Sequence, residues 1–133
     1  MTAPEARPRA GAGAIALAAV LDVALVVTFA AIGRGSHARA ATAAGLFETA
    51  WPFLAGLAVV WLAGRVWRNP FAVVSTGIVV WIGTVALGQL FRLLSGGTTA
   101  TAFIIVSAVT LGAFLVGWRL IAMLIRRLRR RGA

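Results

Sequence analysis

The chain has 133 residues, 61% of them hydrophobic, and its mean hydropathy is +0.96. A soluble domain is roughly 45–50% apolar, so water is excluded as the only solvent of this protein. There is no cysteine, which excludes disulfides, thiolate metal ligands and thiol nucleophiles. The net charge of +10 comes from arginines that flank apolar segments, which is typical of membrane proteins, and we do not expect nucleic-acid binding.

Four apolar stretches are long enough to cross a bilayer, which needs about twenty helical residues for a hydrocarbon core about 30 Å thick. They cover residues 12–33, 44–64, 71–94 and 101–124. The first stretch is too long for a signal peptide and is followed by others, so we expect it to be retained. Short connections favour antiparallel neighbours. The sequence predicts an all-α bundle of four transmembrane helices over 12–124, with tails at 1–11 and 125–133.

The arginines predict how the bundle is oriented. Ten of them fall on the side of the two termini, and only Arg34, Arg39 and Arg92 fall opposite. Positive charge gathers on the cytoplasmic side, so we expect a multi-pass plasma-membrane protein with both termini in the cytoplasm. We also expect Trp118 and Arg119 to anchor at the inner membrane surface. The basic tail should contact anionic lipid through Arg126, Arg127, Arg129, Arg130 and Arg131.

Asp22 stands about ten residues from either end of the first predicted helix, near the bilayer midplane. A carboxyl group at that depth must be neutral, paired or hydrated, and such acids often lie in ion or proton paths. The alternative is an interhelical hydrogen bond to Thr84, Ser107 or Thr110, which lie at similar depth. Under the first interpretation, Asp22→Asn abolishes proton-linked activity and leaves folding intact.

Several polar residues are predicted to meet in the outer half of the bundle. The candidates for a polar or ligand-binding site are Asp22, Arg34, His37, Glu48, Pro52 and Arg92. Pro52 has no N–H, so the carbonyl of Glu48 loses its usual helical partner. The alternative interpretation is a structural ion-pair cluster. We assign no catalytic residue, metal site or cofactor, because no nucleophile–base pair is visible and His37 is the only histidine.

Several strings together resemble a family of small four-helix membrane proteins, the domain of unknown function 3054. The resemblance covers about Ile15 to Arg119, and it is carried by LDVALVVTFAAIGRGSH, TAWPFLAGLAVVW, VVWIGTVALGQLFR and AFIIVSAVTLGAFLVGWR. It implies the membrane fold, and it implies no reaction or substrate.

Three functional hypotheses follow from these residues. The first is a small transport or permeation subunit, acting as a homo-oligomer because four short helices leave little room for a pathway. The second is a non-catalytic partner or scaffold for another membrane protein. The least favoured is an enzyme acting on a lipid headgroup, with Glu48 or His37 as the general base.

Overall fold

The described residues form a bundle of four α-helices. The structure, a computed structural model, describes residues 10–35 and 42–132. Its helices are α1 (Ala12–Gly35), α2 (Ala43–Ala63), α3 (Ile78–Leu94) and α4 (Thr101–Arg131), and no strand occurs in these ranges. Four helical segments are long and apolar enough to cross a membrane. The predicted all-α fold is therefore confirmed, and the chain is a multi-pass membrane protein.

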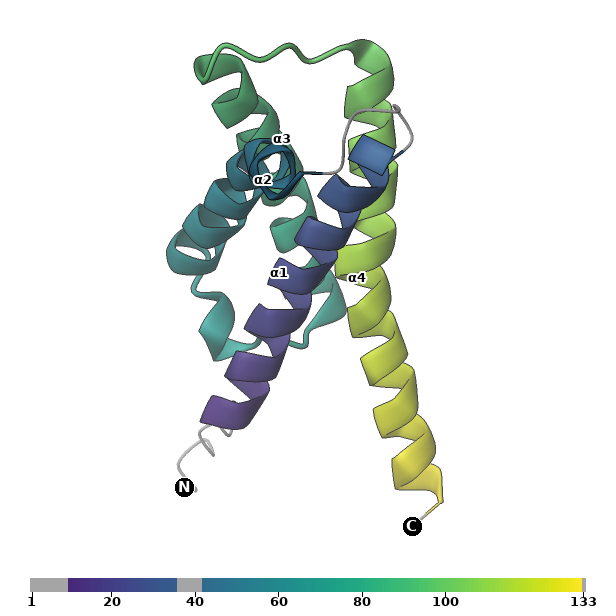
Figure 1. Cartoon of the computed structure of the whole chain (residues 1–133). Helices are drawn as coiled ribbons and strands as arrows, with labels where there is room; N and C mark the ends of the chain where they lie inside the picture. Colours follow the sequence, from purple (N-terminus) through teal and green to yellow (C-terminus); the bar gives the residue numbers. More distant parts are fainter. Residues whose placement is uncertain (1–9, 36–41, 133) are drawn as a thin grey trace.

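The start of α1 and the end of α4 lie at the same end of the bundle and diverge from each other in Figure 1. The α2–α3 connection, residues 64–77, is directed toward the same end, crosses α1 in this view and does not reach as far as either helix end. We call this end the terminal end, and the opposite end, which carries the α3–α4 connection, the distal end. The terminal half of the bundle is therefore built from two long helices and a shorter hairpin.

The α2–α3 connection differs from the expected continuous helix beginning at residue 71. Arg65 has a left-handed backbone (φ 50°), a 3-10 turn follows at Val66–Arg68, and a π-helix covers Val73–Gly77 before α3 begins. Pro70 explains the irregularity, because proline lacks an N–H and disfavours the helical conformation of the residue before it. The hydroxyl of Thr76 donates to the carbonyl of Asn69 (2.7 Å) and fastens the connection.

Helix α4 is longer than the sequence suggested. It was expected to end near residue 124, but it runs to Arg131, so the basic tail is largely helical. Arginine is a good helix former, and cationic side chains near a helix C-terminus interact favourably with the helix dipole. The arginines of the tail consequently have fixed positions around a helix.

Glycines allow close packing between the helices. The ring of Phe53 on α2 lies against Gly88 on α3, where an added Cβ would overlap ring atoms. The indole of Trp81 lies against Gly112 on α4, and its N–H donates to the carbonyl of Ala108 (2.7 Å). Small residues at these contacts bring helices together in a membrane, where hydrophobic burial gives little drive.

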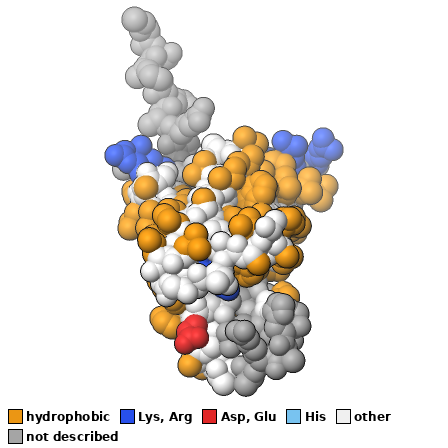
Figure 2. All heavy atoms as spheres, turned by 90° about the horizontal axis from the view of Figure 1, so that it is seen from above, with side chains coloured by type: hydrophobic (Ala, Val, Ile, Leu, Met, Phe, Trp, Pro, Cys, Tyr) orange, Lys and Arg blue, Asp and Glu red, His pale blue; other side chains and the backbone are white. Residues whose placement is uncertain are grey.

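Most of the helical surface faces outward. Only 17–33% of the residues in the most apolar window of each span are buried within the chain. Large hydrophobic side chains are exposed on all four helices, for example Val20, Leu62 and Val109. Figure 2 looks down on the distal end and shows hydrophobic side chains across this view, with arginine side chains at two of its edges and near its middle. An apolar outer surface is what a lipid environment requires.

Candidate functional site

A buried ion pair joins the first helix to the last. The guanidinium of Arg119 on α4 contacts the carboxylate of Asp22 on α1 through two hydrogen bonds, Nη2 to Oδ2 (2.8 Å) and Nη1 to Oδ1 (2.9 Å). Both side chains are 0% exposed. This two-pronged geometry matches the planar fork of arginine to a carboxylate and is stronger than a neutral hydrogen bond.

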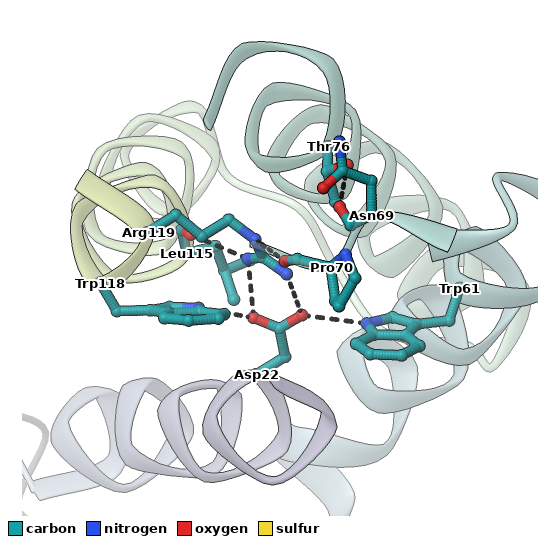
Figure 3. Close-up of polar contacts among 8 residues, drawn as sticks. All are labelled: Asp22, Trp61, Asn69, Pro70, Thr76, Leu115, Trp118 and Arg119. Atoms are coloured by element: carbon teal, nitrogen blue, oxygen red, sulfur yellow. Dashed lines mark hydrogen bonds and ion pairs between the residues drawn. The ribbon is translucent and has the colours of Figure 1, made fainter. Parts of the chain in front are cut away.

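Two tryptophans complete the hydrogen bonding of the carboxylate. Trp61 on α2 donates its indole N–H to Oδ2 of Asp22 (2.9 Å), and Trp118 on α4 donates to Oδ1 (2.8 Å). They approach the carboxylate from opposite sides (Figure 3). Each oxygen therefore accepts two hydrogen bonds, which uses the acceptor sites of an ionised carboxylate.

The α2–α3 connection supplies a backbone acceptor for the arginine. Nε of Arg119 donates to the carbonyl of Pro70 (2.9 Å), and Nη1 also donates to the carbonyl of Leu115 (2.9 Å). The guanidinium stacks on the ring of Trp118, 4.4 Å from its centroid. The five residues Asp22, Trp61, Pro70, Trp118 and Arg119, hereafter the ion-pair cluster, tie together α1, α2, α4 and the connection.

Local sequence explains how the connection reaches the ion pair. Backbone outside a regular helix has carbonyls without helical partners, and at membrane depth it is tolerated only when buried in protein or lining a cavity. Pro70 is buried in the protein, and its carbonyl accepts a hydrogen bond from Arg119 in place of a helical partner. Gly77 leaves space for the arginine stem, because an added Cβ would lie 3.2 Å from Cδ of Arg119.

The ion pair corrects two expectations from the sequence. The partners of Asp22 are Arg119 and the two tryptophans, rather than Thr84, Ser107 or Thr110. Arg119 was also expected to anchor at the lipid surface, but it is fully buried, so it does not face lipid. Its neighbour Trp118 is half-buried and turns its N–H inward.

Of the other candidates for the predicted outer site, the three that the structure describes do not gather around Asp22. Arg92 donates from Nε to the carbonyl of Thr98 (2.7 Å) at the distal end, Glu48 is exposed on α2, and Pro52 is buried one turn further along that helix. His37 and the side chain of Arg34 lie outside the described residues. Asp22 instead contacts Arg119, which also donates to the carbonyl of Pro70 in the α2–α3 connection (Figure 3).

An aromatic cluster separates the ion pair from the distal polar residues. Phe29 and Phe53 meet edge to face with centroids 5.3 Å apart, and Phe103 lies 6.3 Å and 6.0 Å from them. The guanidinium of Arg92 stacks on the ring of Phe103, 4.3 Å from the centroid. Beyond Asp22, the buried face of α1 is thus apolar at Val26 and Phe29.

Two buried oxygen atoms of α3 have no hydrogen-bond partner. They are Oγ1 of Thr84, which is 0% exposed, and Oε1 of Gln89, whose amide nitrogen donates to the hydroxyl of Ser107 (2.7 Å). Buried polar atoms are usually paired, so unpaired ones indicate spare hydrogen-bonding capacity. Within the described residues, no group of three His, Asp or Glu side chains could hold a metal ion.

Comparison with known proteins assigns the chain to a family. The model of a family described as "Protein of unknown function (DUF3054)" matches residues 19–122, which is most of the chain. The chain belongs to the DUF3054 family. All five residues of the ion-pair cluster lie within the DUF3054 match, whereas the arginines beyond residue 122 lie outside it. No curated protein and no solved structure matches this DUF3054 chain.

Proposed function

We propose that this protein is a small transport or permeation subunit in which the Asp22–Arg119 pair holds the terminal half closed. The observation that carries the proposal is the fully buried ion pair beside irregular backbone. Charged groups within membrane spans are costly, and they commonly mark ion or proton pathways. Non-helical backbone at membrane depth is also a common component of transport sites.

The part of the bundle between the aromatic cluster and the ion pair supports the same proposal. In this proposal the aromatic cluster closes the distal side of the bundle and the ion pair closes its terminal side. Thr84 lies between these levels, since its carbonyl is close to Gly56, which lies between Phe53 and Trp61 along α2. Its unpaired hydroxyl could bind a small polar species that enters when either closure opens.

We further propose that the subunit acts as a homo-oligomer in the plasma membrane, with both termini in the cytoplasm. The uneven arginine distribution supports this orientation. The largely outward-facing spans support assembly, because one chain encloses little interior space.

Ion flux into liposomes tests the gating role. The purified protein would be reconstituted with an internal pH dye and, separately, with chloride- and potassium-sensitive dyes. We expect flux of at least one ion above that of protein-free liposomes. We expect at least a threefold increase with Asp22→Asn/Arg119→Gln, because neutral side chains hold the closure less firmly. Glu48→Gln, which changes an exposed carboxylate, is the matched control and should leave flux unchanged.

Other outcomes would separate the alternatives. Loss of proton flux in the double variant would mean that Asp22 carries protons, and the gating role would be wrong. Background flux for all three ions with the wild-type protein would remove the permeation hypothesis. That result would favour a non-catalytic membrane partner, which the saturated hydrogen bonding of the Asp22 carboxylate also fits. Chemical cross-linking in native membranes would then identify the protein bound to the outward helical faces.

A further inference from the structure

A pocket lies at the terminal end, between the α2–α3 connection and the last turns of α4. Its volume is about 410 Å³. One wall is basic and the other is largely apolar. Its lining residues are Asn69, Phe71, Ala72, Val73 and Val74 from the connection and Met123, Arg126, Arg127 and Arg130 from α4.

The basic wall follows from the unexpected length of α4. Arg126 and Arg130 are one helical turn apart, so they lie on the same side of the helix and face the connection together with Arg127. Arg129 and Arg131 belong to the same turns but do not line the pocket. If the helix ended at residue 124, nothing would hold these arginines in one arrangement.

One arginine of the pocket is positioned through the ion-pair cluster. The guanidinium of Arg126 stacks on the ring of Phe71, 4.2 Å from its centroid. Phe71 in turn meets Trp118 edge to face at 5.2 Å, and Trp118 donates its N–H to Asp22. Phe71 therefore links Arg126 to the ion-pair cluster. This contact positions the Arg126 side chain in the absence of a ligand.

The charge of the pocket has no acidic counterpart among the described residues. Those residues contain two acids: Asp22 is bonded to Arg119, and Glu48 lies in the second turn of α2, toward the distal end. Three arginines on one side of a pocket therefore favour an anion. Arginine recognises phosphate with several parallel hydrogen bonds, and Asn69 adds a further polar group.

We propose that this pocket binds the phosphate headgroup of an anionic phospholipid, with the glycerol and acyl chains along Val73 and Val74. Val74 is 73% exposed, so the apolar wall opens toward the surrounding lipid. A soluble anion would use the arginines and leave this wall uncovered, whereas a phospholipid matches both walls. Basic pockets between membrane helices are suited to anionic headgroups.

Lipid binding to the purified full-length chain tests the proposal. Native mass spectrometry would count dioctanoyl phosphatidylglycerol molecules retained during a titration, with dioctanoyl phosphatidylcholine and inorganic phosphate as comparison ligands. We expect one tightly bound phosphatidylglycerol per chain, and binding of the zwitterionic lipid at least tenfold weaker. Inorganic phosphate should neither bind tightly nor displace the lipid at equal concentration.

Two double variants with the same net charge distinguish lipid binding in the pocket from lipid attraction to the rest of the basic tail. Arg126→Gln/Arg130→Gln removes two pocket arginines, and Arg129→Gln/Arg131→Gln removes two that do not line it. We expect the first pair to weaken phosphatidylglycerol binding at least tenfold and the second pair less than threefold. All four side chains are exposed, so both variants should fold, and far-ultraviolet circular dichroism would verify this.

Three results would overturn the proposal. Equal losses in the two variants would show diffuse attraction of lipid to the whole tail. Equal binding of the two phospholipids would show that charge is not recognised. Displacement of phosphatidylglycerol by inorganic phosphate at equal concentration would assign the pocket to a soluble anion. None of these results depends on ion flux, so the proposal stands or falls separately from the transport function.

Discussion

Replacing Asp22 with asparagine should destabilise the fold strongly. The new side chain keeps one acceptor oxygen and places an NH₂ group where two donors, from Arg119 and one tryptophan, now converge. At least two hydrogen bonds are lost, and the buried guanidinium keeps a charge without a partner. Removing one member of a buried ion pair costs about 3–5 kcal/mol, so we expect Asp22→Asn to lower the free energy of unfolding by that amount.

The assay is reversible unfolding in mixed micelles as the fraction of sodium dodecyl sulfate is raised, followed by circular dichroism. Glu48→Gln is the control, because Glu48 is exposed, and it should change the free energy of unfolding by no more than about 0.5 kcal/mol. The structure thus replaces the sequence-based expectation that Asp22→Asn leaves folding intact.

A double-mutant cycle isolates the pair itself. In Asp22→Asn/Arg119→Gln no charge remains buried without a partner, so the combined loss should fall short of the sum of the two single losses by about 2 kcal/mol or more. A loss for Asp22→Asn no larger than that for Glu48→Gln, or strictly additive single losses, would refute the reasoning.

Two further predictions concern packing and hydrogen bonding, both measured by the same unfolding assay. Gly88→Ala should lower the free energy of unfolding by about 1–3 kcal/mol, because its methyl group would overlap the ring of Phe53. Gly117→Ala, with nothing within 4 Å, should be neutral or stabilising by up to about 1 kcal/mol, and equal effects would contradict the packing contact. Trp61→Phe should cost about 1–3 kcal/mol because the carboxylate loses a donor, and an equal cost for Trp67→Phe, at an exposed site, would argue against that role.

The helical architecture could be predicted because lipid imposes simple rules on sequence. The span lengths follow from bilayer thickness, and the bounds agree closely where a local signal exists. At the start of α2, for example, Thr42 accepts a hydrogen bond from the backbone N–H of Gly45 (3.0 Å), as an N-cap does. The prediction failed around Pro70, because hydropathy does not distinguish a regular helix from 3-10 and π-helical turns of similar composition.

The partner of Asp22 was missed because depth was counted separately along each helix. Counting from the distal ends at about 1.5 Å per residue, Asp22 is about 20 Å from Gly35, and Arg119 is about 27 Å from Thr101. A difference of about 7 Å is a little more than one helical turn. Helix tilt and the length of an arginine side chain can span it, so counting alone could not decide the pairing.

The charges inside the apolar segments indicate the partner of Asp22 better than depth counting does. Arg119 is followed by six apolar residues before Arg126, whereas Arg92 is followed by only two before Ser95. A cation that far inside an apolar segment has no easy route to water and requires a buried anion. Of the two acids among the described residues, only Asp22 is that far from a helix end, so it is the anion that Arg119 requires.

The tryptophans could not have been assigned in the same way. An indole has an apolar body and a single N–H donor, so the same residue fits a membrane-surface belt or a buried acceptor. The difference depends on whether a carboxylate lies within reach, which is a property of the assembled bundle. Once Asp22 and Arg119 are paired, the carboxylate still has free acceptor sites, and Trp61 and Trp118 fill them. The ion pair therefore accounts for the inward-turned N–H groups of these two tryptophans.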